Sequence, residues 1–218
     1  TEVEAKQLLA KAGLRIPQEQ LAATAQEAVG FAASLDSAVA LKIASPDIPH
    51  KTEIGGVLLN VISGDDVYRG FETLIDRAAS AHPGARIEGV TVSEMVPAGV
   101  ETVIGIANDP AFGPVVMFGL GGIFVEALND VSFRLAPIGK AEARRMIDEI
   151  RGRVVLDGVR GQGPVDIDLL ADALSRLSAF GVRNADVIES VDINPLILTA
   201  DAAYAVDGLI VPRPSEAT

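Results

Sequence analysis

The spacing of the apolar residues changes along this chain, and that change limits the folds it can adopt. In the first third, apolar residues recur every three or four positions, the period of helices packed on one side. In the second half they mostly alternate with polar residues, the period of half-buried strands. Two further helical patterns interrupt that half. The sequence therefore predicts an α/β fold of the α+β kind, with helices placed against sheets.

Individual elements follow from the same patterns and from their end signals. The first helix has an apolar face formed by Ala5, Leu8, Leu9 and Ala12, and Gly13 can end it. Thr24 and Ser63 are candidate helix caps. Helices are expected at 5–12, 25–32, 66–78, 141–150 and 166–180, strands at 38–43, 57–62, 90–95, 102–107, 114–118 and 132–136, and a closing hairpin at 187–198 and 203–206.

Composition excludes several function classes. The 218 residues are 49% hydrophobic but only 4% aromatic, so the core is built from Ala, Val, Leu and Ile. The net charge of −12 argues against non-specific nucleic-acid binding, although backbone amides can still form a local anion pocket. The absence of Cys excludes disulfides, thiolate metal sites and thiol catalysis.

Location follows from what the sequence lacks. No apolar stretch is long enough to span a bilayer and no signal peptide is visible, so we expect no membrane partner and a cytoplasmic protein. Thr1 indicates either a processed chain or a piece of a longer one.

The chain has two histidines in different settings. His82 directly follows a predicted helix, where a solvated side chain is the ordinary interpretation. His50 lies in a loop between Pro49 and Lys51. Imidazole titrates near neutrality and can act as a nucleophile, so His50 is either a reactive loop residue or another solvated one.

A glycine pair follows that loop. Gly55 and Gly56 precede a predicted strand, where their amides could face a phosphate, although a simple turn is the commoner role of such a pair. The pattern is neither a Walker motif nor a dinucleotide fingerprint.

Three oxygen-bearing side chains lie near the C-terminus. Asp192 and Asn194 are two positions apart in an apolar strand and therefore share one of its faces. Asp207 follows the next strand, within reach across a hairpin. Carboxylate and amide oxygens suit Mg²⁺, and polar strand ends facing water are the alternative.

Three segments together resemble one known family. Residues 40–57 resemble the first-lobe signature of the ATP-grasp domain of ADP-forming acyl-CoA synthetases, and residues 112–126 resemble the middle motif of that family. Residues 192–196, Asp-Ile-Asn-Pro-Leu, resemble the metal strand, which is shared with the succinyl-CoA synthetase β subunit. The resemblance covers nearly the whole chain in the order typical of the family.

The resemblance implies a two-lobed ATP-grasp fold with a nucleotide bound between the lobes. Residues 1–218 would form one such domain: lobe 1 at about 22–94, lobe 2 at about 1–21 plus 95–211, and a tail at 212–218. The implied reaction is acyl-CoA + ADP + phosphate = acid + CoA + ATP, through a phosphohistidine relay. Mg²⁺ and ATP or ADP are implied as cofactor and substrate. A CoA-binding portion, in the same longer chain or in a separate α subunit, is the implied partner.

The family's roles carry over to matching positions of this sequence. His50 stands at the phosphate-carrier position, and Asp192 stands where the family has an acid that steadies the phosphohistidine, a Glu in succinyl-CoA synthetases. Asn194 and Asp207 would hold Mg²⁺. The implied nucleotide-binding residues are Lys42, Gly55, Gly56 and Arg134 for phosphates, Glu94, Met95 and Val96 for adenine, and Glu101 for ribose.

Two other functions stay open from the sequence. One is a non-catalytic nucleotide-binding regulatory module fused to an acyltransferase or a scaffold. A decayed site would be expected to have lost at least one of the residues retained here, which are Lys42, His50, Asp192, Asn194 and Asp207. The other is a carboxylate–amine ligase of the same fold, which would form an acyl phosphate directly and would not need His50.

Overall fold

The chain divides into two compact units, each with its own sheet and core. The computed structural model describes residues 2–35, 37–48, 51–121, 129–158 and 163–214. The large unit comprises Thr1–Ile16 and Val96–Thr218, and the small unit comprises Pro17–Met95.

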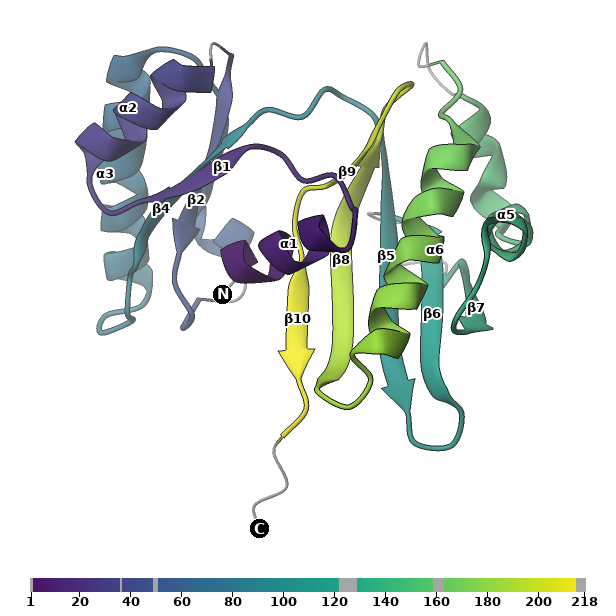
Figure 1. Ribbon diagram of the computed structural model, residues 1–218. Coiled ribbons are helices and arrows are strands. Elements are labelled where there is room, and N and C mark those ends of the chain that lie inside the picture. Colours follow the sequence, from purple (N-terminus) through teal and green to yellow (C-terminus); the bar gives the residue numbers. More distant parts are fainter. Residues whose placement is uncertain (1, 36, 49–50, 122–128, 159–162, 215–218) are drawn as a thin grey trace. The chain divides into compact units, whose positions relative to one another are not determined.

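The small unit is a four-stranded antiparallel sheet packed against two helices (Figure 1). The strands lie in the order β1-β4-β2-β3. Its elements are β1 (Glu19–Ala22), α2 (Ala25–Leu35), β2 (Val39–Ala44), the short 3-10 helix η1 (Lys51–Ile54), β3 (Val57–Val61), α3 (Gly64–Ala81) and β4 (Gly89–Glu94). The helix expected at 66–78 is present within α3, which buries Val67, Phe71, Leu74 and Ala78 on one face.

The large unit is built on a six-stranded antiparallel sheet, in the order β10-β8-β5-β6-β7 with β9 also paired to β8. Its elements are α1 (Glu2–Lys11), β5 (Val100–Asp109), β6 (Gly113–Leu120), β7 (Val131–Leu135), α5 (Lys140–Asp148), η2 (Arg151–Asp157), α6 (Ile167–Arg183), β8 (Ile188–Leu198), β9 (Ala203–Ala205) and β10 (Leu209–Pro212). Figure 1 shows α6 lying along β5 and β6.

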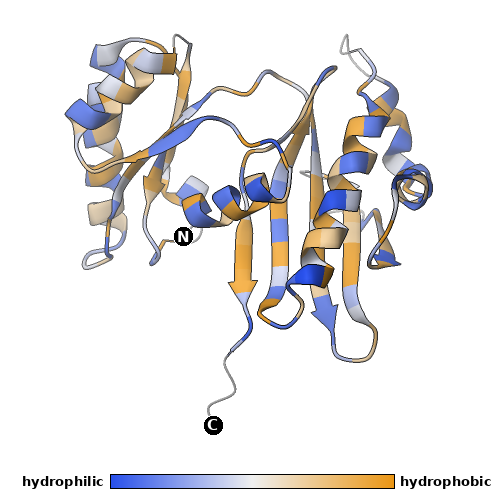
Figure 2. Cartoon of the chain, in the orientation of Figure 1, coloured by the Kyte–Doolittle hydropathy of each residue, from blue (hydrophilic) through white to orange (hydrophobic). Residues whose placement is uncertain are grey.

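Strand alternation gives this sheet two different faces. Ile104, Ile106, Val191 and Ile193 are buried in the core beneath α6. In Figure 2 the apolar colour runs along β6 and β10, whereas α6 alternates between polar and apolar bands. Residues of the opposite parity, including Glu101 and Asp192, therefore lie on the face of the sheet opposite α6.

Most expected elements are present, and the differences have physical causes. The strands β1 and β10 were not expected, since each is a short segment that gains its structure only by pairing with β4 or β8. The predicted apolar face of the first helix is partly wrong: Leu8 is 43% exposed, whereas Lys6 is fully buried. In the described part of the chain, the helices are all too short or too polar to cross a membrane.

The cap of α3 yields a test of the small unit. The Asp66 amide donates to Ser63 Oγ at 3.1 Å, and Ser63 Oγ donates to Asp66 Oδ2 at 2.6 Å. We expect Ser63→Ala to lower the free energy of unfolding by about 1 kcal/mol, the usual contribution of a helix cap. Urea denaturation measures the change. Ser80→Ala, at an exposed position near the other end of α3, is the control, and an equal loss in both variants would contradict the capping role.

Candidate functional site

The register of β8 brings the three predicted oxygen ligands together. Asp192 pairs with Leu209 of β10, and Leu196 pairs with Ala205 of β9. These two pairs bracket Asp207, which lies in the bend that connects β9 to β10, opposite Asn194. The pairing of β8 with β5 is also irregular between Ile193 and Leu196, and this bulge carries Asn194.

The carboxylates of Asp192 and Asp207 interact electrostatically. Asp192 is exposed and Asp207 is half-buried. Protein atoms partly shield the Asp192 carboxylate from water, and this desolvation, together with the negative charge of Asp207, raises the pKa of Asp192 above its ordinary value. Two carboxylates that repel each other form a place where a cation is electrostatically favoured.

The donor set fits Mg²⁺. Among the described residues, no group of three or more His, Cys, Asp or Glu side chains could form a metal cage. Mg²⁺ does not require one, because it takes few protein ligands and completes its shell with water and substrate phosphates. The carboxylate of Asp207 and the side-chain oxygen of Asn194 are such hard oxygen donors.

A glycine lies beside these residues. Gly105 of β5 pairs with Asp192 on one side and with Met117 of β6 on the other. A Cβ at Gly105 would lie 3.2 Å from the Val191 carbonyl oxygen and 3.8 Å from Asp192 Oδ1, so a larger residue would be crowded there. Glu101, four residues earlier in β5, is exposed on the same face of the sheet. The large unit therefore presents Glu101, Gly105 and Asp192 on one face of its sheet.

In the small unit, the glycine pair ends a helix. The Gly56 amide donates to the Lys51 carbonyl at 2.8 Å, and the Gly55 amide donates to the Thr52 carbonyl at 3.1 Å. Gly55 has a φ of +63°, so this is a Schellman motif that closes η1. Both amides are engaged within the turn. Donation from them to a phosphate therefore stays a prediction and requires the turn to open.

The described residues on either side of the histidine loop are anchored. Ile48 is buried in the core of the small unit, and the Arg86 amide donates to Asp47 Oδ2 at 2.7 Å. On the other side, Arg77 of α3 donates to the Gly55 carbonyl at 2.8 Å. His50 itself lies outside the described residues. Sequence reasoning did not single out Asp47 or Arg77. The position of Asp47 between two prolines was the only available signal.

The remaining predicted nucleotide residues lie at strand positions. Lys42 is half-buried near the end of β2, where it pairs with Val57 and Thr91. Glu94 ends β4, and the boundary between the units falls between Met95 and Val96. The Glu94 amide donates to Gln18 and the Met95 amide to Ala38, at 2.9 and 3.1 Å. Their predicted contacts with adenine and phosphate stay predictions.

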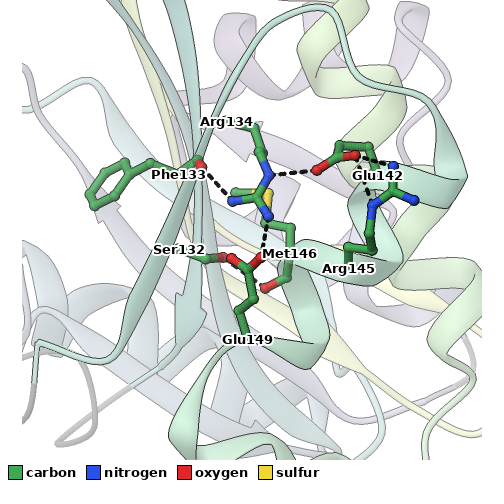
Figure 3. Close-up of polar contacts among 7 residues, drawn as sticks. All are labelled: Ser132, Phe133, Arg134, Glu142, Arg145, Met146 and Glu149. Atoms are coloured by element: carbon green, nitrogen blue, oxygen red, sulfur yellow. Dashed lines mark hydrogen bonds and ion pairs between the residues drawn. The ribbon is translucent and has the colours of Figure 1, made fainter.

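Arg134 has partners that the sequence did not reveal (Figure 3). Its Nε donates to Glu142 Oε1 at 2.6 Å, its Nη1 donates to the Phe133 carbonyl at 2.8 Å, and its Nη2 binds Glu149. Glu149 and Glu142 hold the pKa of the guanidinium above its ordinary value. Arg134 pairs with the buried Val116, so it lies on the opposite face of the sheet from Asp192. The structure therefore does not bring Arg134 together with Asp192, Asn194 and Asp207.

Comparison with known proteins shows the family to which this chain belongs. Residues 1–211 match the family model of the ATP-grasp domain. The chain is 41% identical over 210 residues to the acetate–CoA ligase (ADP-forming) I subunit beta of Pyrococcus furiosus, covering 96% of this chain and 90% of that subunit. It is 42% identical over 194 residues to acetate–CoA ligase (ADP-forming) I of Archaeoglobus fulgidus, covering 89% of this chain and 28% of that longer protein.

Solved structures agree with this assignment. The chain is similar to acetyl-coenzyme A synthetase 1 of Ca. Korarchaeum cryptofilum in complex with coenzyme A and Ca-AMPCP, with a TM-score of 0.95 and 42% identity over 97% of this chain and 92% of that one. A second complex of that enzyme holds coenzyme A and Mg-AMPPCP, with its phosphohistidine segment pointing towards the nucleotide-binding site. It has a TM-score of 0.85 and 39% identity over 98% and 92% of the two chains.

The charge repulsion at Asp192 predicts a pH-dependent stability effect. A folded-state pKa above the unfolded value means that the ionised group opposes folding at neutral pH but not below its ordinary pKa. In metal-free buffer, Asp192→Asn should therefore raise Tm at pH 7.5, on the order of 1 °C because the group is exposed, and less at pH 4. Differential scanning calorimetry measures both. Asp186→Asn, at an exposed position just before β8, is the control. A rise at pH 4 that equals the rise at pH 7.5 would refute the prediction.

The contacts of Arg134 predict a structural rather than a ligand effect. Arg134→Gln leaves Glu142 and Glu149 without this partner, so we expect a loss of about 1 kcal/mol, or roughly 2–4 °C in Tm. ADP affinity, measured by calorimetry with Mg²⁺ present, should stay unchanged. Arg183→Gln, at an exposed position near the end of α6, is the control. Weaker ADP binding at an unchanged Tm would instead support the phosphate contact expected from the sequence.

Proposed function

Because the chain belongs to the ATP-grasp family and aligns along nearly its whole length with ADP-forming acetate–CoA ligase β subunits, we propose that it is the nucleotide-binding, phosphoryl-transferring component of an ADP-forming acyl-CoA synthetase. The reaction is acyl-CoA + ADP + phosphate = acid + CoA + ATP. The observation that carries the proposal is the juxtaposition of Asp192, Asn194 and Asp207 by the register of β8 with β9 and β10.

In this proposal, Asp192, Asn194 and Asp207 of the large unit lie next to the phosphates of the nucleotide. Asp207 and Asn194 would hold Mg²⁺, which supplies charge neutralisation at the transferring phosphoryl group. Support comes from the two facing oxygen donors and from a relative that binds Mg-AMPPCP. Glu101, exposed on the same face as Asp192, accepts hydrogen bonds from the ribose hydroxyls.

The small unit supplies the other nucleotide contacts in this proposal. Lys42 places a positive charge on a nucleotide phosphate from the end of β2. The backbone of Glu94, Met95 and Val96 pairs with the adenine edge through groups other than the Glu94 and Met95 amides, which donate to Gln18 and Ala38. Gly55 and Gly56 cover the phosphates only when their turn opens, since both amides are engaged when η1 is closed.

His50 carries the phosphoryl group between a phosphorylated partner and ADP. A ring nitrogen of His50 attacks the phosphorus of a phosphorylated partner, so that a P–N bond forms as the bond to the partner breaks. In the second step a β-phosphate oxygen of ADP attacks the same phosphorus, the P–N bond breaks, and ATP forms. Asp192 steadies the imidazole, because a neighbouring carboxylate favours the charged forms of histidine.

The CoA chemistry belongs to a partner portion. One relative is a β subunit of similar length, and another is a longer protein of which this chain spans 28%. We therefore propose that the CoA-binding portion that passes phosphate to His50 is either a separate α subunit or another part of the same longer chain.

Direct labelling tests the relay. Incubation with Mg²⁺ and γ-³²P-labelled ATP should give protein label that is labile in acid and stable in base, since the reverse of the second step phosphorylates His50. His50→Ala should abolish the label while MgADP binding, measured by calorimetry, stays unchanged. His82→Ala, the other histidine of the chain, should label like the wild type. Equal labelling of His50→Ala and wild type would refute the carrier role. Absence of label in a wild-type chain that binds MgADP would favour a regulatory module.

A further inference from the structure

A lysine of the N-terminal helix is buried without a role in the proposed reaction. Lys6 of α1 has no solvent exposure and is one of the largest fully buried side chains among the described residues. Taking an ammonium group out of water costs several kcal/mol unless it is paired and hydrogen-bonded. The partners of Lys6 therefore indicate what this burial stabilises.

Those partners lie beside the proposed metal ligand. Lys6 Nζ donates to the Val206 carbonyl at 3.1 Å and forms an ion pair with Glu2 Oε1 at 3.1 Å. The aliphatic part of Lys6 packs near Gly208, where a Cβ would lie 3.6 Å from Lys6 Cγ. Val206 and Gly208 directly precede and follow Asp207, so Lys6 bonds to the backbone on one side of that residue and its stem lies near the backbone on the other.

The rest of the N-terminal segment holds the neighbouring residues. The Arg15 guanidinium stacks over the Tyr204 ring at 4.4 Å, and the Ala205 amide donates to the Arg15 carbonyl at 2.9 Å. On the β8 side, the Val206 amide donates to the Pro195 carbonyl at 3.1 Å, next to Asn194. The bend that carries Asp207 is thus held by the N-terminal segment on one side and by β8 on the other. Lys6 is the side chain that donates to the Val206 carbonyl in this bend.

We propose that Lys6 is a positioning residue for the metal site. By holding the Val206 carbonyl, it fixes the bend Val206–Gly208 so that Asp207 stands opposite Asn194. Mg²⁺ demands near-ideal octahedral geometry, so displacement of one of two protein ligands weakens its binding. Groups that orient metal ligands typically contribute a factor of about 10–100 to metal affinity. The inference rests on the proposed function in that Asp207 and Asn194 are taken as the ligands.

The test compares four variants of the full 218-residue chain. Lys6→Met keeps the length of the side chain and removes the donor. Lys11→Met makes the same change at an exposed position of α1 and is the matched control. Gly208→Ala places a Cβ 3.0 Å from Leu9 Cδ1 and 3.6 Å from Lys6 Cγ, which crowds the packing of α1 on the same bend while the Lys6 donor is kept. Asp207→Asn removes the proposed ligand itself.

Three quantities are measured on each variant. They are the Mg²⁺ concentration that half-saturates ADP binding, the ADP affinity in EDTA, and the amide hydrogen exchange of residues 204–209 in metal-free buffer. For Lys6→Met and Gly208→Ala we expect about a 10-fold rise in the half-saturating Mg²⁺ concentration, with unchanged affinity in EDTA and faster exchange at 206–208. Lys11→Met should match the wild type.

The outcomes separate this inference from the proposed function. If Asp207→Asn keeps the wild-type dependence on Mg²⁺, the ligand assignment is wrong whatever Lys6 does. If Asp207→Asn loses that dependence while Lys6→Met and Gly208→Ala keep it, the positioning role of Lys6 is wrong. A Lys6→Met variant that fails to fold leaves Gly208→Ala as the deciding variant, because it perturbs the packing of α1 on the bend with the lysine present.

Discussion

Pairing along β8 is the constraint on which the large unit depends. This strand pairs with β5 on one side and with β9 and β10 on the other, so it sets where Gly105 and the bend that carries Asp207 lie relative to Asp192 and Asn194. Its alternation sends Val191 and Ile193 into the core and leaves Asp192 and Asn194 exposed. The same backbone hydrogen bonds that hold the sheet together therefore set the distance between oxygen donors from two different segments. Fold and site cannot be varied independently here.

The N-terminal segment shows how a distant piece of sequence supports that site. Residues 1–16 precede the small unit, yet they belong to the large unit. Their contacts concentrate on residues 204–208, at the place where the pairing of β8 passes from β9 to β10. A bend between two short strands has few backbone hydrogen bonds of its own. Support from α1 replaces the rigidity that a continuous strand would have supplied.

Sequence reasoning found what depends on local pattern and missed what depends on tertiary partners. Helix α3 was predictable because its cap and apolar period are local in the sequence, and the shared face of Asp192 and Asn194 follows from strand geometry alone. Lys6 was missed because its burial depends on a carbonyl 200 positions away, which no helical pattern encodes. The carboxylate partners of Arg134, Glu142 and Glu149, were missed because they become its neighbours only when α5 packs on β7.

An acidic chain that binds a polyanionic nucleotide needs a local reason, and the large unit provides one. The formal net charge is −12, and the charge of Asp207 raises the pKa of Asp192, so these carboxylates repel each other. A nucleotide phosphate next to them would add to the repulsion, whereas a divalent cation held by the proposed ligands Asp207 and Asn194 would turn it into attraction. Binding of metal and of nucleotide would then be linked, and each would raise the affinity for the other by the same factor. In the proposed function, the acidic pair that opposes the bare nucleotide would thus make this face selective for the metal-bound form.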